Sequence, residues 1–152
     1  MTARECMFCE QVQSETPPEG GWVLRNKLVS AWILPGCEYP GWFVLQLNRH
    51  AEGYLEFTAD EAAALGDACW TLARAVHSVT GVNRSYQYAM GEVNPHFHML
   101  IGPPPQQAEE RGKRLLAGII TREAPFIDVK VAYDVAQQAA LVVERLAATD
   151  AS

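Results

Sequence analysis

The sequence has no long apolar segment, and none of its apolar runs approaches the roughly 18–20 residues that are needed to cross a bilayer. The N-terminal stretch MTARECMFCE also lacks the apolar core of a signal peptide. Lysine and arginine number 12 in 152 residues and nowhere form a cluster that could follow the phosphates of a duplex. We therefore expect a cytoplasmic protein, with neither a membrane nor duplex nucleic acid as its partner.

The composition is that of an ordinary globular domain. Apolar residues make up 49% of the chain and charged residues 20%, and 152 residues are enough to build a hydrophobic core. We predict one domain over residues 1–152. The net charge of −6 still allows a small phosphorylated ligand, because one site can be locally positive in an acidic protein.

Short apolar runs separated by turn residues predict strands. Residues 22–35 indicate a hairpin that turns at Asn26-Lys27, and 42–47 a third strand that leads to His50. Two later strands are predicted at 84–90 and 96–101, the second ending at GPPP because proline cannot donate to a sheet.

The clearest helix follows His50. Thr58 and Glu61 form a capping-box pattern, and Gly81 is a stop signal. The apolar face repeats at steps of four and three, in Leu65, Cys69, Leu72, Val76 and Val79.

The tail beyond Pro105 is less regular. Residues 106–118 are polar with some helical character, 123–131 read as a loop or an edge strand, and 132–147 as an amphipathic helix. Strands and helices in separate groups favour an α+β fold with an antiparallel sheet.

The segment VNPHFHMLIG at 93–102 carries two of the four histidines. In a strand, His96 and His98 would point to one face, with Phe97 and Met99 on the other, in the core. Cys6, Cys9, His50 and one of the strand histidines make a tetrahedral zinc set of common type, two thiolates and two imidazoles. Alternatively, Cys6 and Cys9 are ordinary thiols without a metal; a redox CxxC is disfavoured because no βαβ unit surrounds it.

Four segments together resemble the histidine-triad (HIT-like) superfamily of nucleotide hydrolases and transferases: CMFC, GWFVLQLNRH, TADEAAALG and NPHFHMLIGP. The last is also similar to the NPHPH segment of galactose-1-phosphate uridylyltransferases, in the same superfamily. The resemblance covers a core of about residues 5–105, with 106–152 as a C-terminal extension. It implies a HIT-like α+β fold: an antiparallel sheet of about five strands, a main helix after His50 and a C-terminal helix.

The triad motif H-x-H-x-H is incomplete, and two registers fit it. In one, Asn94, His96 and His98 occupy the three positions and His96 is the nucleophile. In the other, the positions are His96, His98 and Leu100, and His98 is the nucleophile. We favour the second, because zinc-bearing members use the first histidine as a ligand, and asparagine is a poor zinc ligand.

The resemblance implies an enzyme that forms a nucleotidyl-histidine intermediate on His98 and hydrolyses or transfers nucleotides. The implied structural zinc is held by Cys6, Cys9, His50 and His96. Asn94 and the turn at Gly91 would hold the phosphate of a nucleotide or dinucleoside polyphosphate. Many members are dimers, so a homodimer is an expectation.

Leu100 supports an alternative to this enzyme. It stands where a hydrogen-bond donor is expected, and leucine cannot donate. The alternative is a catalytically impaired module that binds a nucleotide or a protein.

Overall fold

In the computed structural model, residues 6–123 and 125–150 are described, and for Asp150 only the backbone. The elements in chain order are α1 (Met7–Gln13), β1 (Leu24–Arg25), β2 (Val29–Trp32), β3 (Phe43–Leu47), the 3-10 turn η2 (Tyr54–Glu56), α2 (Ala59–Thr80), β4 (Tyr86–Tyr88), β5 (His98–Gly102), α3 (Lys113–Ile120) and α4 (Val129–Asp150). No helix in this part of the chain is long and apolar enough to cross a membrane.

The five strands form one antiparallel sheet in the order β1-β2-β3-β5-β4. This confirms the predicted α+β fold and the number of strands. The hairpin turns where it was predicted, because the Asn26 side chain accepts hydrogen bonds from the backbone N–H groups of Leu28 and Val29.

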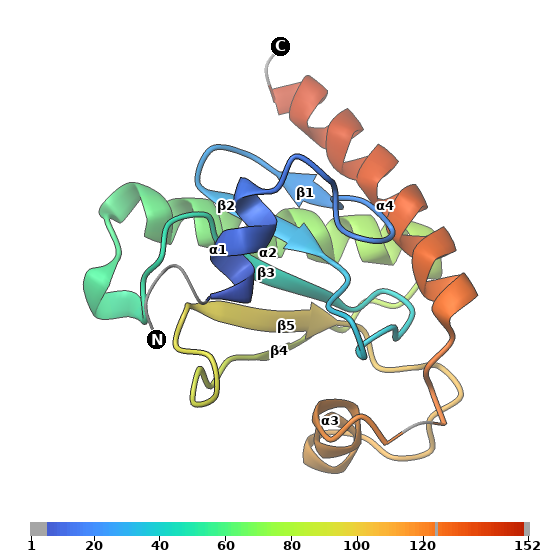
Figure 1. Cartoon of the computed structure of the whole chain (residues 1–152). Helices are drawn as coiled ribbons and strands as arrows, with labels where there is room; N and C mark the ends of the chain where they lie inside the picture. Colours follow the sequence, from blue (N-terminus) through green and yellow to red (C-terminus); the bar gives the residue numbers. More distant parts are fainter. Residues whose placement is uncertain (1–5, 124, 151–152) are drawn as a thin grey trace.

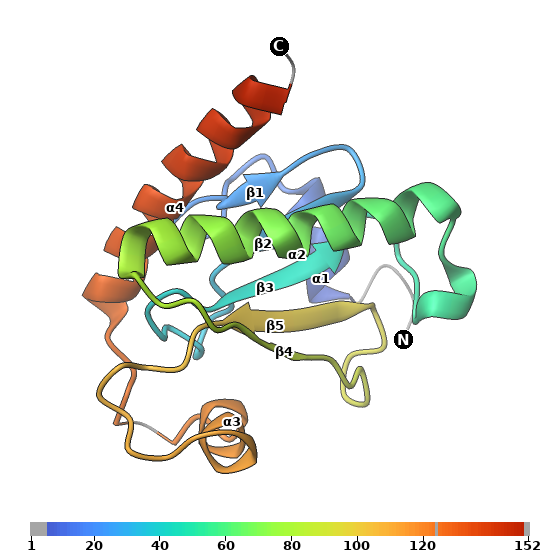
Figure 2. The same ribbon diagram turned by 180° about the vertical axis from the view of Figure 1, so that it is seen from behind.

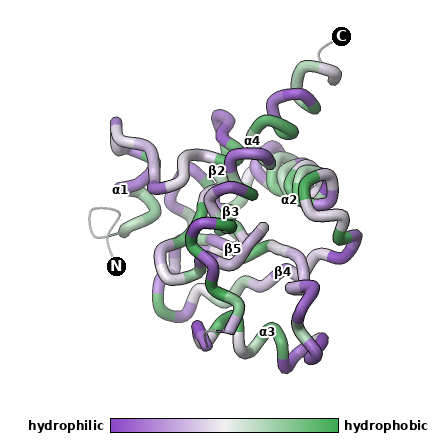
Figure 3. The backbone as a smooth tube through the Cα atoms, turned by 90° about the vertical axis from the view of Figure 1, so that its right-hand side faces the viewer, coloured by the Kyte–Doolittle hydropathy of each residue, from purple (hydrophilic) through white to green (hydrophobic). Residues whose placement is uncertain are grey.

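The helices lie in two layers around this sheet (Figures 1 and 2). The long helix α2 crosses one face and packs against α4, and α1 lies on the other face. Figure 3 shows the sheet from the side, with α1 and α2 on opposite sides of it. α3 lies on the β4–β5 side of the sheet, away from β1.

Alternation along the strands divides the core into two clusters. Leu45, Met99 and Ile101 pack toward α2, whereas Val44 and Leu100 pack toward α1 and α3. Phe97 joins the α2 side, as the sequence predicted. The face next to α1 is therefore the one that His98 and Leu100 share.

Helix α2 forms as predicted. The Thr58 side chain accepts from the Glu61 N–H, the Glu61 carboxylate accepts from the Thr58 N–H, and Gly81 ends the helix in a left-handed conformation with φ +75°. Arg49 adds a two-pronged ion pair to Glu61, with both N–O distances 2.8 Å. The cap therefore joins the start of α2 to the segment that carries His50.

The tail differs from the prediction in two places. α3 begins at Lys113, so residues 106–112 of the predicted stretch 106–118 are not helical. The edge-strand alternative for 123–131 is wrong, since α4 already begins at Val129. The Asp128 carboxylate accepts from the Val131 N–H at 3.0 Å, which is an N-cap contact that starts the helix there. Residue 124 of this stretch, like residues 1–5, lies outside the described part.

Candidate metal centre and histidine pocket

Two thiols and two imidazoles meet at one point beside the sheet. The Sγ atoms of Cys6 and Cys9 and the ring nitrogens of His50 and His96 all lie within 4.8 Å of one another. Three segments bring them together: Cys6 and Cys9 come from the start of α1, His50 from the loop after β3, and His96 from the residues just before β5. These are the four residues that the sequence grouped as a zinc set.

Hydrogen bonding decides which nitrogen of His96 faces the sulfurs. Its Nε2 lies 2.8 Å from the carbonyl oxygen of Leu47, and because that oxygen can only accept, Nε2 carries the proton. Nδ1 of the neutral ring then bears the lone pair. It lies 3.3 Å from Sγ of both Cys6 and Cys9, and Nδ1 of His50 lies 3.4 Å from Sγ of Cys9.

These distances match the demands of a zinc ion. Zinc bonds of about 2.3 Å to sulfur and about 2.0–2.1 Å to nitrogen at tetrahedral angles place sulfur and nitrogen roughly 3.6 Å apart. The observed 3.3–3.4 Å separations are close to that value. The group is therefore consistent with a metal site of the Cys2His2 type.

Burial shapes the protonation of this group. Cys6 and His96 are fully buried and Cys9 nearly so. Burial, then the Cys6 thiol and the Glu10 carboxylate, raise the pKa of Cys9 to about 11. Burial lowers the pKa of His96. The hydrogen bond to the Leu47 carbonyl raises this pKa, and the neighbouring His50 and His98 lower it further. A bound divalent cation reverses this preference for the neutral thiol, because a coordinating thiol is deprotonated.

His98 opens β5 next to this group. Its Nδ1 lies 2.7 Å from the carbonyl oxygen of His96, so Nδ1 carries the proton and Nε2 of the neutral ring bears the lone pair. The ring of Phe8 packs against both imidazoles, with centroids 5.5 Å from His96 and 4.4 Å from His98. Both histidines therefore lie on the α1 side of the sheet, as strand alternation predicted, although the strand itself begins only at His98.

A cavity of about 290 Å³ lies in front of the half-buried His98. Gly91 and Asn94, the two residues that the sequence predicts to bind the phosphate, both line it. The Asn94 side-chain oxygen accepts from the His96 N–H at 3.2 Å and lies 3.8 Å from the Cys6 sulfur, so it fixes the turn. Among the described residues no acceptor is found for the Asn94 Nδ2, which leaves its N–H groups available to a ligand.

Leu100 lies in the wall of the same cavity and is 8% exposed. It pairs with Val44 across the sheet and packs in the apolar cluster on the α1 side. The missing donor is thus replaced by an apolar surface.

Several other histidines, cysteines and arginines of the chain lie away from the cavity. His77 is exposed on α2, and Cys69 contacts the Met99 sulfur at 3.6 Å. Arg49 forms an ion pair with Glu61, and the Cζ atom of Arg25 lies 4.5 Å from the centroid of the Trp22 ring.

The sequence missed two contributors to this site. Phe8 belongs to α1, which is seven residues long, has no side-chain N-cap and showed no sequence signal. Arg122 lines the cavity from the end of α3. No local pattern points to Arg122, because only the tertiary placement of α3 brings it there.

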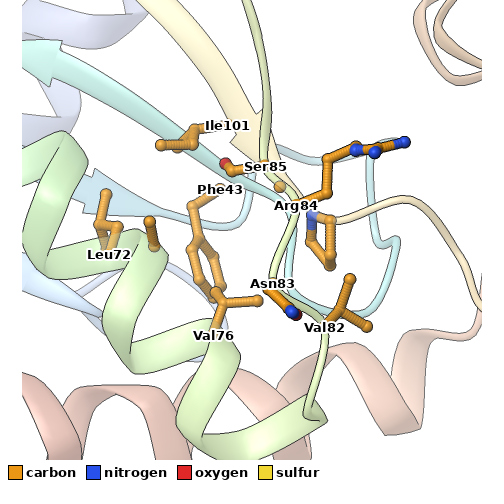
Figure 4. A pocket seen from close by; sticks show the side chains of 11 residues that line it. Phe43, Leu72, Val76, Val82, Asn83, Arg84, Ser85 and Ile101 are labelled. Atoms are coloured by element: carbon orange, nitrogen blue, oxygen red, sulfur yellow. The ribbon is translucent and has the colours of Figure 1, made fainter. Parts of the chain in front are cut away.

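A second cavity, drawn in Figure 4, is much smaller at about 20 Å³. It lies between α2 and the sheet, where Leu72 and Val76 face Phe43 and Ile101, and the segment 82–85 closes it. This volume holds about one water molecule. The cavity is on the opposite face from His98, so it has no part in the site.

Similarity to known proteins is found in structure and not in sequence. No family model matches the chain, and no curated protein matches its sequence significantly. A hypothetical histidine triad nucleotide-binding protein from Sulfolobus tokodaii superimposes with a TM-score of 0.64 at 19% identity, over 93% of each chain. A zinc-bound histidine triad family protein from Mycobacterium smegmatis superimposes with a TM-score of 0.66 at 13% identity, over 97% of this chain and 99% of that one.

The chain has the histidine-triad fold. A uridylyltransferase structure superimposes equally well, with a TM-score of 0.67 at 17% identity over 93% of this chain, which spans about half (48%) of that protein. The predicted resemblance to both groups is confirmed at the level of fold. The Cys6, Cys9, His50 and His96 group is consistent with a metal site, and the Mycobacterium smegmatis protein of the same fold is described as zinc-bound.

Proposed function

We propose that this protein is a nucleotide hydrolase or nucleotidyl transferase that acts through His98 and carries a structural zinc. The observation that carries the proposal is the orientation of His98. Its Nδ1–H is held by the His96 carbonyl, and its ring lines a cavity that adjoins the Cys2His2 group. Similar folds include a histidine triad nucleotide-binding protein and uridylyltransferases, which supports a nucleotide as the ligand.

In the first step, the lone pair on Nε2 of His98 attacks the α-phosphorus of the substrate. A nitrogen–phosphorus bond forms, the bond from phosphorus to the leaving group breaks, and the leaving group departs with the electron pair. In the second step, water or another hydroxyl attacks phosphorus from the opposite side. The nitrogen–phosphorus bond breaks, the nucleophile loses its proton to solvent, and neutral His98 is restored.

The chain's own groups would bind and orient the phosphate. The free Nδ2 of Asn94 and the backbone of the Gly91 turn, whose φ of +72° favours glycine, border the cavity beside His98. Donors fixed before the reaction stabilise charge without reorganising. A zinc ion held by Cys6, Cys9, His50 and His96 would tie α1, the loop after β3 and the start of β5 together.

The geometry also supports the choice between the two registers. His96 is fully buried, its Nε2 donates to Leu47, and its Nδ1 faces two sulfurs. Neither nitrogen of His96 is therefore free to reach phosphorus. His98 is half-buried and borders the cavity, which favours His98 as the nucleophile.

The proposal is tested by turnover of dinucleoside polyphosphates and nucleoside phosphoramidates. We expect His98→Ala to lower kcat/KM by at least about a thousandfold. His77→Ala is the matched control, because His77 is exposed on α2 and should leave turnover unchanged. Rapid base quenching with α-labelled substrate should trap label on the wild-type protein and not on His98→Ala, because the histidine N–P bond is labile in acid and stable in base. Equal turnover by the wild type and His98→Ala would refute the proposal.

Leu100 favours a second candidate function, a module that binds a nucleotide or a protein without turning it over. Calorimetry would then detect nucleotide binding while no product forms in the same sample. Absence of nucleotide binding would leave a partner-binding role. The expected homodimer is a separate prediction, to be checked by light scattering.

A further inference from the structure

The cavity beside His98 has one cation in its wall. Its lining is largely apolar, including Phe8, Leu34 and Leu100, and Arg122 is the only lysine or arginine among its described lining residues. Glu92 is the only acidic one. A nucleotide phosphate that enters this cavity therefore meets a single fixed positive charge.

We propose that Arg122 binds the phosphate that leaves during the reaction and so selects phosphoanhydride substrates over phosphoramidates. This inference rests on the proposed function, in which His98 attacks the α-phosphorus. It assigns to Arg122 the stabilising contact that Leu100 cannot make.

Arg122 occupies a backbone position that usually belongs to glycine. Its N–H donates to Ile119 and the Glu123 N–H donates to Gly118, which is the Schellman pattern at the end of α3. With φ +58°, Arg122 is the one non-glycine residue of positive φ in the described chain. A side chain here carries a steric cost that glycine avoids, so arginine stands at this position against the backbone preference.

Gly36 makes room for the guanidinium. A Cβ atom at Gly36 would lie 2.8 Å from Nη1 of Arg122 and 3.1 Å from its Cζ. The guanidinium therefore lies directly against the Gly36 backbone, where any other residue would displace it. The glycine thus leaves space for a side chain that follows α3, well away in sequence.

No described carboxylate neutralises Arg122. Within the described residues it forms no ion pair, and the nearby Glu38 carboxylate accepts instead from the Gly36 N–H at 2.8 Å. A polar neighbour of Arg122 is Cys37. Burial raises the pKa of the Cys37 thiol, and Arg122 opposes this increase. Burial therefore favours the neutral thiol of Cys37, and no ion pair among the described residues keeps Arg122 from a phosphate.

The chemistry of arginine decides which leaving group it serves. A guanidinium binds phosphate oxygens with two parallel N–H groups and stays protonated throughout the accessible pH range. When the anhydride P–O bond breaks, the electron pair stays on a phosphate oxygen that needs no proton. An amine that leaves from a phosphoramidate must gain a proton, which Arg122 cannot supply.

The test compares diadenosine tetraphosphate with adenosine 5′-phosphoramidate as substrates. Arg122→Ala should lower kcat/KM for the tetraphosphate by about a hundredfold and change the phosphoramidate value by less than about threefold. Arg122→Lys should recover part of the loss, because it keeps the charge and loses the two-pronged contact. Arg114→Ala is the control, since Arg114 is an exposed residue of α3 outside the cavity.

Equal losses on both substrates, or no loss, would overturn the role of Arg122. The proposed function fails separately, if the wild type turns over neither substrate or if His98→Ala matches the wild type. In that case calorimetry with ADP on the wild type and on Arg122→Ala still decides whether Arg122 binds a phosphate. At least about a tenfold loss of affinity in Arg122→Ala supports phosphate binding by Arg122, and unchanged affinity refutes it.

Discussion

His98 donates its Nδ1–H to the carbonyl oxygen of His96 at 2.7 Å, so the main chain of one histidine orients the ring of the other. The ring of His96 is held by its own contacts. Its Nε2–H donates to the Leu47 carbonyl, and its Nδ1 lies next to the sulfurs of Cys6 and Cys9. The orientation of His98 thus depends on the segment that the Cys2His2 group anchors. Metal binding and catalysis are therefore expected to be coupled.

The first prediction concerns the metal. Purified protein should contain one zinc per chain, and Cys9→Ser should lose it, because a hydroxyl is a far weaker zinc ligand than a thiolate. Removal of the zinc should lower the Tm by more than about 10 °C, since several kcal/mol of binding energy stabilise the fold. Elemental analysis and thermal unfolding provide the measurements.

Cys69→Ala is the matched control for the metal, because Cys69 is a half-buried cysteine outside the Cys2His2 group. It should retain its zinc. Wild-type protein that is purified without chelators and contains no metal would refute the prediction.

The second prediction is a pH dependence of stability that comes from Glu61. Its ion pair with Arg49 and the hydrogen bonds at the helix cap lower the pKa of Glu61 from 4.5 to about 2. Since the folded pKa is the lower one, the stabilisation is present above about pH 4.5 and is lost as the pH falls toward 2.

Urea unfolding of Glu61→Gln measures this contribution. At pH 7 the variant should be less stable by about 1 kcal/mol, and the difference from the wild type should shrink between pH 4.5 and 2.5. Asp60→Asn is the control, an exposed carboxylate in the same helical turn with no hydrogen-bond partner among the described residues. A pH-independent difference for Glu61→Gln would contradict the assignment.

How much the sequence could predict depended on how local each signal was. The hairpin turn at Asn26 and the Thr58–Glu61 cap are made by neighbours in sequence, and both formed as predicted. The strand at 96–101 began two residues late, because the His96 ring bonds to Leu47 and the Phe97 N–H to Ala51 in place of a strand ladder.

The metal ligands of the site could be predicted because few residue types bind zinc. Two cysteines and two histidines are the usual ligands of zinc, so Cys6, Cys9, His50 and His96 could be grouped across 90 residues of chain. Arg122 could not be predicted as a site residue, because a surface arginine has no distinctive sequence pattern. Its placement follows from the packing of α3 and from the space at Gly36.

The third prediction concerns the apolar residue in the cavity wall. Leu100→His adds a group that can give a proton to a leaving amine, so turnover of adenosine 5′-phosphoramidate should rise by about tenfold or more. Leu100 is nearly buried, so the variant should also lose about 1–3 kcal/mol of stability. Leu34→His is the control, because it places a histidine elsewhere in the wall of the same cavity. An equal gain in both variants would mean that the position of Leu100 has no special role.

The fourth prediction concerns Gly102 at the far end of β5. The indole of the buried Trp42 lies on this residue, and a Cβ atom at Gly102 would come closer than 3.0 Å to its Cγ, Cδ1 and Cδ2. Trp42 cannot move away easily, since its Nε1–H donates to the Pro103 carbonyl at 2.8 Å. Gly102→Ala should therefore destabilise the protein by about 2–3 kcal/mol, through overpacking of the cluster that also contains Leu100.

Gly66→Ala is the matched control for Gly102→Ala. Gly66 lies within α2, and an added Cβ atom would meet nothing within 4 Å. Because alanine is a better helix former than glycine, this variant should gain about 0.5–1 kcal/mol. Urea unfolding should thus move the two midpoints in opposite directions for the same one-carbon change. A Gly102→Ala midpoint equal to that of the wild type would show that Trp42 can move, and that the packing at this end of β5 is looser than the contact with Gly102 implies.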